Sequence, residues 1–162
     1  MYISYSALDT WTKCPFKFKL KYIDKLRLDK GSLYSAFGNA IHSTLQKIIP
    51  DNKVNINETF NWLFQKELKR LSYETKTEIF KDEKLKVIAK DMALTGANLC
   101  RLTAEALEQK FPGYELISVE QKFVEPIIGY EFNSHDFVGV IDIIIKYLNY
   151  YYILDYKSTS WG

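Results

Sequence analysis

Apolar residues in the first two thirds of the chain recur at helical spacing. Between residues 6 and 28 they stand three or four positions apart and so share one face of a helix. They are Leu8, Trp11, Pro15, Phe18 and Tyr22. The same period predicts helices over 36–49, 58–71 and 77–111. We therefore expect a helical part over about residues 1–112.

Serine, proline and glycine mark the expected ends of these helices. Ser6, with Asp9 three residues later, is typical of a capping box at a helix start. Pro15 has no N–H and restricts the residue before it, so we expect a break there. Pro112 and Gly113 are typical of the end of the long helix.

From residue 114 the pattern becomes strand-like. We predict strands over 114–124, 129–133, 137–148 and 150–158. Their apolar residues form near-continuous runs, which are typical of strands covered on both faces. The chain is therefore expected to form a single α/β domain over 1–162. In that domain the N-terminal helices pack on a sheet of about residues 114–160.

Composition supports a globular domain and excludes several classes of protein. The chain has 162 residues, of which 47% are hydrophobic and 26% charged, so it is neither disordered nor fibrous. Apolar runs stay below about 18 residues and the N-terminus lacks a signal-peptide pattern, so we expect no membrane partner. Two cysteines cannot build a disulfide framework, which favours the cytoplasm. The 19 lysines against 3 arginines fit AT-rich codons, and so a bacterium or a phage in its host.

Two aspartates and a lysine fall in the last two predicted strands. A tight turn near residues 148–149 would pair these strands and place Asp142 opposite Asp155. Asp155 and Lys157 share a face because side chains alternate along a strand. Two opposed carboxylates among isoleucines repel each other, and Mg²⁺ or Mn²⁺ would remove that repulsion. A salt bridge from Lys157 would also reduce it, so from spacing alone both interpretations stay open.

Four short motifs follow one another along the chain. They are Ser6-x-Leu8-x-x-Trp11-x-x-Cys14-Pro15-x-x-Phe18-x-x-x-Tyr22, Gly38-x-x-Ile41-His42-x-x-Leu45, Gly139-x-x-Asp142 and Asp155-x-Lys157-Ser158. In this order they resemble the RecB-like branch of the PD-(D/E)XK nuclease superfamily. That branch includes CRISPR-associated RecB-type exonucleases and phage and recombination exonucleases. The resemblance covers residues 6–158 and implies a restriction-endonuclease-like core with a mixed sheet.

The resemblance also implies a metal-dependent site. His42, Asp142 and Asp155 would ligate Mg²⁺ or Mn²⁺, together with the backbone carbonyl of Tyr156, and the cation would activate water. Lys157 would orient that water or stabilise charge in the transition state. Without the other motifs, His42 would be interpreted as an ordinary packed or surface histidine.

Other polar residues have two interpretations each. Glu120 stands where related nucleases often carry an acidic residue of the site, and it could equally be a solvated strand charge. Lys13, Lys17 and Lys21 could follow the phosphates of DNA or form a solvated helix face. The apolar and aromatic residues of the first motif are expected to serve the fold.

Cys14 raises the question of an iron–sulfur cluster. In some RecB-like nucleases a cysteine in this region joins three C-terminal cysteines around such a cluster. The sequence contains two cysteines, Cys14 and Cys100, so these residues cannot provide the four thiolates of an iron–sulfur cluster. We expect both cysteines to be buried thiols.

RecB-like nucleases continue after the last motif into a helix with Q-x-x-x-Y. Because the sequence after Lys157 does not contain this motif, we expect a C-terminally truncated domain, with a second copy or a partner subunit covering the sheet. The expected function is a metal-dependent DNA nuclease, exonuclease-like, in recombination, repair, phage replication or CRISPR adaptation. The alternative is a catalytically incomplete DNA-binding or assembly module that keeps the nuclease fold. A third possibility is a structural salt-bridge network around Lys157.

Overall fold

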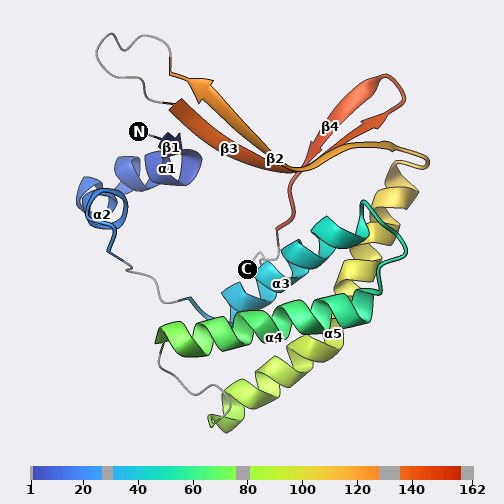
Figure 1. The fold of residues 1–162 in the computed structure, drawn as a ribbon, viewed down its shortest axis with the longest axis horizontal. Coiled ribbons are helices and arrows are strands. Elements are labelled where there is room, and N and C mark those ends of the chain that lie inside the picture. Colours follow the sequence, from blue (N-terminus) through green and yellow to red (C-terminus); the bar gives the residue numbers. More distant parts are fainter. Residues whose placement is uncertain (1, 27–30, 76–80, 128–135, 158–162) are drawn as a thin grey trace.

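A mixed sheet and a set of helices form two layers of the molecule (Figure 1). The computed structural model describes residues 2–26, 31–75, 81–127 and 136–157. Helices precede the three longer strands along the chain, and the sheet contains both parallel and antiparallel pairs. The expected α/β class with a mixed sheet is therefore confirmed.

The N-terminal segment is a short strand followed by a broken helix. It comprises β1 (Tyr2–Ser4), α1 (Tyr5–Lys13), α2 (Pro15–Phe18) and the π-helix η1 (Lys19–Ile23). The break expected at Pro15 is confirmed, since Cys14 has an extended backbone with φ −160° and ψ 98°. The capping box expected at Ser6 is wrong. The helix begins directly after β1, so the Ser4 hydroxyl accepts the Ala7 N–H at 3.2 Å and caps it instead.

Three longer helices follow: α3 (Leu33–Ile48), α4 (Ile56–Thr75) and α5 (Glu83–Lys110). Ser32 and Ser35 form a reciprocal capping box at the start of α3. The Asp82 carboxylate accepts the N–H groups of two residues in the first turn of α5. The helix therefore begins at Glu83 rather than at 77, and residues 77–80 lie outside the described part of the chain.

Strand β3 (Asp136–Tyr147) is the centre of the sheet. It pairs antiparallel with β2 (Glu115–Pro126) along most of its length. Its other edge pairs with β1 in parallel over three residues and then with β4 (Tyr150–Leu154) as a hairpin. Tyr147 faces Tyr150, so the predicted hairpin register is confirmed. The strand predicted over 129–133 falls outside the described residues.

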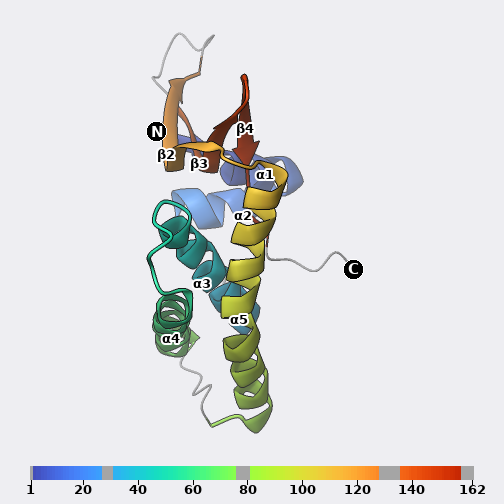
Figure 2. The same cartoon turned by 90° about the vertical axis from the view of Figure 1, so that its right-hand side faces the viewer.

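The buried core has two parts that meet near the end of the described chain. The larger part joins α3, α4 and α5 around the stacked rings of Phe60 and Phe64, whose centroids are 5.6 Å apart. The smaller part packs the end of α5 against Ile143 and Ile145 of β3. Tyr156 packs against both parts. Figure 2 shows these three helices on one side of the sheet.

The prediction of strands covered on both faces is wrong. Within the described residues, Val140 is 53% exposed and Ile153 is 67% exposed. The helices pack only on the side of Ile143 and Ile145. The long apolar runs therefore form exposed apolar surface instead of meeting a second helical layer. None of the described helices combines the length and the hydropathy needed to cross a membrane.

Gly96 allows α5 to approach α4 closely, which predicts a stability effect. A Cβ added there would overlap the buried ring of Phe60. We expect Gly96→Ala to lower the free energy of unfolding by about 1–3 kcal/mol through overpacking, despite alanine's higher helix propensity of about 1 kcal/mol. Gly139→Ala is the matched control, since its added Cβ meets no atom within 4 Å. Urea denaturation measures both, and equal stability of the two variants would contradict this packing.

The two cysteines differ in accessibility, so the prediction of two buried thiols is wrong for one of them. Cys14 is exposed because it stands at the break between α1 and α2, whereas Cys100 is buried. Burial raises the pKa of Cys100 to about 11. At pH 8 we expect one thiol to react rapidly with an aromatic disulfide reagent, since only about one Cys100 in a thousand is thiolate. Cys14→Ser should remove the rapid phase, and two rapid phases would refute the assignment.

Candidate functional site

Helix α3 presents two polar side chains, one turn apart, to the carboxylate of Glu120. His42 Nε2 lies 2.8 Å from Glu120 Oε1, and Gln46 Nε2 donates to the same oxygen at 2.5 Å. Residues four apart on a helix lie on one face, so the geometry of α3 alone places His42 and Gln46 side by side. Gln46 was missed in the sequence, where its position four residues after His42 was the available signal.

The backbone of β2 is irregular at this point. Glu120 has φ 53°, in the left-handed region that non-glycine residues rarely adopt. The register also shifts between Leu116 and Ser118, and a bulge of this kind bends and twists a strand. The pairs Val119–Ile143 and Gln121–Ile141 continue on either side, so Glu120 stands opposite Asp142. Such strained backbone persists where its surroundings hold it and is often found at functional sites.

Asp142 connects β3 to two other segments. Its Oδ2 accepts the backbone N–H of Tyr156 at 2.9 Å and lies 3.5 Å from His42 Nδ1. The side chain is only 13% exposed. Simple alternation would place Asp142 on the face opposite Ile143, which packs against the helices. The irregular, twisted strand pair nevertheless brings its carboxylate to α3.

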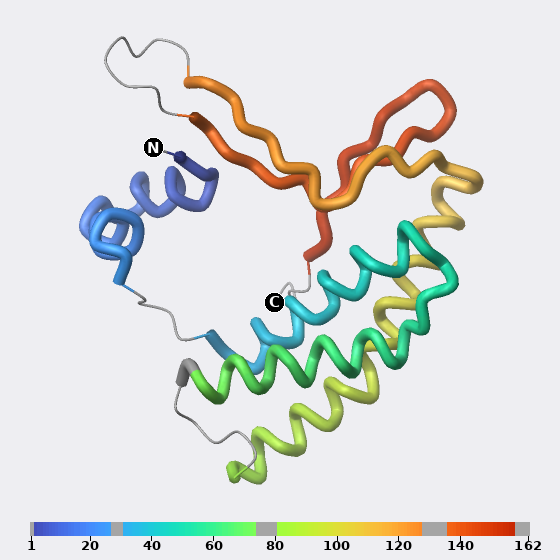
Figure 3. The backbone as a smooth tube through the Cα atoms, in the orientation of Figure 1, coloured from blue at the N-terminus to red at the C-terminus, as the bar shows by residue number. Residues whose placement is uncertain are grey.

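The chain leaves the sheet before the last motif, which corrects the prediction of a strand over 150–158. Strand β4 ends at Leu154, and residues 155–157 are outside the ladder. The reason is that Asp142 takes the Tyr156 N–H through its side chain. Figure 3 traces this segment from the sheet toward α3. Asp155 therefore lies just past the hairpin rather than in a strand pair with Asp142.

Tyr156 holds this segment in place. Its ring packs against both parts of the core, and burial raises the pKa of its hydroxyl, with further contributions from Tyr114 and Asp142. The tyrosine is therefore neutral at physiological pH. The peptide group that the structure brings to Asp142 is the Tyr156 N–H, whereas the resemblance implied the Tyr156 carbonyl as a ligand.

Asp155 and Lys157 form an ion pair beside this cluster. The Lys157 Nζ lies 2.6 Å and 2.8 Å from the two carboxylate oxygens of Asp155. The hydrogen bond that Lys157 donates to Asp155 raises the pKa of Lys157, so this ammonium is charged at physiological pH. Both side chains are more than half exposed. They line a hollow of about 410 Å³ together with Gly38, His42 and Thr103.

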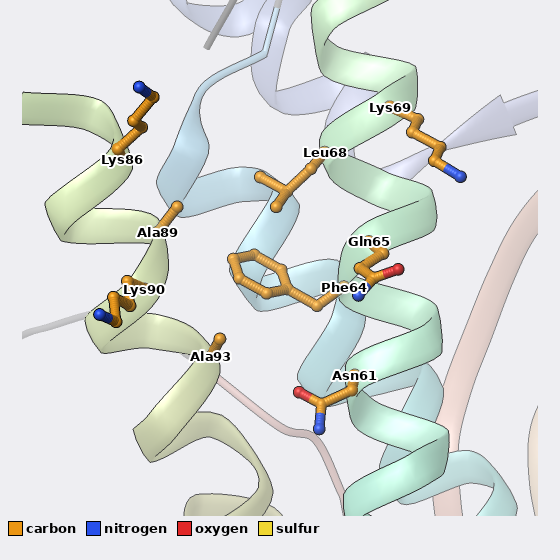
Figure 4. Close-up of a pocket in the computed structure, with 9 residues that line it drawn as sticks. All are labelled: Asn61, Phe64, Gln65, Leu68, Lys69, Lys86, Ala89, Lys90 and Ala93. Atoms are coloured by element: carbon orange, nitrogen blue, oxygen red, sulfur yellow. The ribbon is translucent and has the colours of Figure 1, made fainter. Parts of the chain in front are cut away.

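A second hollow, of about 310 Å³, lies between α4 and α5 (Figure 4). Its apolar floor includes Phe64 and Leu68, and Lys69, Lys86 and Lys90 are among its lining residues. Among the described residues that line it there is no carboxylate. Its oxygen-bearing side chains are the neutral amides of Asn61 and Gln65, and its three lysines repel cations. The cluster beside the first hollow is therefore the candidate for metal chemistry.

The donor set fits a divalent cation. One ligand atom each from His42, Glu120 and Asp142 lies within 4.8 Å of the others. Ligands of one Mg²⁺ ion at about 2.0–2.1 Å stand at most about 4.2 Å apart, so a small side-chain movement suffices. Carboxylates with one imidazole also suit Mn²⁺. Of the ligands that the motifs predict, Asp155 lies outside this trio and pairs with Lys157.

The lysines of the first motif lie in the N-terminal helices, which contact β3 through β1 and α1. The Lys13 Nζ is 2.9 Å from the Asp9 carboxylate. Lys17 lies in α2, and the Nζ of Lys21 is 5.4 Å from the centroid of the Tyr22 ring. The structure places all three outside the cluster around His42.

A model of the PD-(D/E)XK nuclease superfamily matches residues 2–161 of the chain. The match spans the helices, the sheet and the cluster of His42, Glu120 and Asp142. The chain therefore belongs to the PD-(D/E)XK nuclease superfamily. A comparison with curated proteins found no match.

The cluster predicts that divalent cations stabilise the folded chain. At about 100 times its Kd, Mn²⁺ would add about 2.7 kcal/mol, or roughly 5–10 °C in the midpoint of thermal unfolding. Asp142→Asn should remove most of this stabilisation, because it removes the negative charge of one ligand. The asparagine keeps an oxygen that can accept the Tyr156 N–H. Asp91→Asn, on the exposed surface of α5, is the matched control. If Mn²⁺ raised the midpoint of thermal unfolding equally in Asp142→Asn and in wild type, the proposed metal site would be contradicted.

Proposed function

We propose that the chain is a metal-dependent DNA nuclease whose site lies between α3 and the sheet. The observation that carries this proposal is the convergence of His42, Glu120 and Asp142, from three elements, beside the ion pair of Asp155 and Lys157. Superfamily membership supports nuclease chemistry. Mg²⁺ and Mn²⁺ both suit the donor set.

Each residue has a distinct proposed role. Asp142 and His42 would hold the cation, and Asp155, which is paired with Lys157 in the structure, would be a further ligand. Glu120 either completes the ligand set or fixes the orientation of the His42 ring, as carboxylates do for metal-binding histidines. Bound Mg²⁺ or Mn²⁺ would supply a Lewis acid and a water of lowered pKa. Lys157, charged and exposed, donates to the oxygens of the phosphate as negative charge develops on them.

The finer assignment rests on the four motifs. Their order supports the RecB-like branch and an exonuclease acting in recombination, repair, phage replication or CRISPR adaptation. Lys13, Lys17 and Lys21 would contact the phosphates of the DNA substrate. Two unpaired cysteines support a reducing compartment such as the cytoplasm.

The exposed face of the sheet supports a further subunit. Ile117, Val140 and Ile153 are all exposed there, and apolar strand residues of this kind favour association. We propose that a second copy or a partner subunit covers them. Light scattering that shows a monomer with no partner would remove this part of the proposal.

Hydrolysis of single- and double-stranded DNA with Mg²⁺ or Mn²⁺ tests the function. We expect Asp142→Asn to lower kcat by about 100-fold or more, since it weakens the hold on the cation. Lys157→Ala should lower kcat by about 10²–10³-fold, because it removes a donor to transition-state charge. Lys53→Ala, an exposed lysine in the loop before α4, is the matched control.

The outcomes separate the alternatives. Activity that survives both substitutions would show that the site is misassigned. DNA binding without cleavage, in folded wild-type protein with either cation, would instead favour the DNA-binding module that keeps the nuclease fold.

A further inference from the structure

Trp11 of the first motif and Phe16, which stands between its specified positions, are exposed in the N-terminal segment. Phe18 and Tyr22 of the motif are partly buried. Phe16 is 67% exposed and Trp11 is 50% exposed. Among the described residues 2–26, Ala7 alone is fully buried. The expectation that this motif serves the fold therefore accounts for contacts within the segment, but it leaves an open aromatic surface.

The rings are held in a fixed row. Trp11 meets Phe18 edge-on with centroids 5.5 Å apart, and Phe18 stacks on Tyr22 at 5.3 Å. The Tyr22 hydroxyl lies 3.4 Å from the Ser6 hydroxyl, which ties η1 back to α1. This hydrogen bond lowers the pKa of Tyr22. The break at Pro15 permits the fold-back, so the ring of Trp11 is held in place before any ligand arrives, and Phe16 stands next to the break.

The charge of the segment selects an anionic partner. Residues 2–26 carry five lysines and two aspartates, whereas the whole chain has a net charge of +2. The rest of the chain is therefore slightly negative, and the positive excess lies with the exposed rings. Lysines interleaved with aromatic rings suit a strand whose phosphates are negative and whose bases stack. An acidic protein partner would use the lysines, but it has no comparable use for the row of rings.

The segment is also within reach of the proposed site. Strand β1 pairs with β3 at Val138, four residues before Asp142. At strand spacing this is about 13 Å. The segment that carries the exposed rings is therefore anchored to the same strand as the cluster around His42.

We infer that Trp11, Phe16 and the neighbouring lysines form a stacking surface for unpaired bases, which makes single-stranded DNA the preferred substrate. This inference rests on the proposed nuclease function. A duplex keeps its bases stacked inside and offers the rings only its ends, whereas every base of a single strand presents a free face.

Binding without catalysis tests the inference. Fluorescence anisotropy with labelled oligothymidylate and with a duplex of equal length, in EDTA, reports affinity alone. We expect Phe16→Ala to weaken oligothymidylate binding by about tenfold, the loss of one stacked base, and duplex binding by less than about twofold. Phe16→Tyr keeps the ring and should retain affinity. Trp62→Ala is the matched control, because Trp62 is 60% exposed on α4 with the Nζ of Lys66 5.5 Å from its ring centroid.

The lysines provide an independent arm of the experiment. Lys17→Ala should weaken both DNA forms and reduce the salt dependence of binding by about one charge. Unchanged oligothymidylate affinity in Phe16→Ala, or equal losses for single and double strands, would overturn the inference. So would a dimer that Phe16→Ala dissociates without any effect on DNA binding.

The two proposals fail in different ways. Asp142→Asn should bind oligothymidylate as wild type does while losing hydrolysis. If wild type binds through Phe16 but cleaves no DNA with Mg²⁺ or Mn²⁺, the nuclease function fails and the stacking surface stands. If wild type cleaves DNA and Phe16→Ala binds single strands normally, the stacking surface alone fails.

Discussion

The hydrogen bond from the Tyr156 N–H to Asp142 governs how the rest of the site is assembled. It replaces the next ladder bond of the hairpin, so β4 ends at Leu154. The Tyr156 ring then fills the junction of the two core clusters. Because one residue is held by its backbone and its ring together, the chain that follows is directed to α3. Asp155 and Lys157 reach the hollow beside His42 as a consequence.

The site combines a strained backbone with groups from separate elements. Glu120 adopts φ 53° in the middle of a strand, a conformation that costs of order 1–3 kcal/mol. The paired residues on either side and the hydrogen bonds from His42 and Gln46 hold it there. Carboxylates that converge in this way repel one another unless a cation neutralises them. A metal would therefore be bound where the fold has already brought the ligands together.

Sequence reasoning succeeded where the controlling interactions are local. The break at Pro15, the hairpin register and the mixed α/β class all follow from period, proline geometry and turn length. Its predictions were wrong where contacts with other elements decided which residue caps a helix or which surface is buried. Ser4 displaced Ser6 as the cap because β1 pairs with β3, and Cys14 is exposed because it stands at the break between α1 and α2. The apolar strands were expected to be covered on both faces, yet the described helices pack on one face of the sheet.

The sequence by itself determined the order of the long helices and strands, the hairpin register and the residues proposed to hold a cation, because spacing along a strand or helix sets which side chains share a face. Only the tertiary structure decided which of them meet. His42 and Glu120 are 78 residues apart, and their contact depends on α3 packing beneath a locally twisted β2. It also separated Asp155 from the trio and left Trp11 and Phe16 exposed, because burial depends on the elements that pack nearby rather than on a residue's own hydrophobicity.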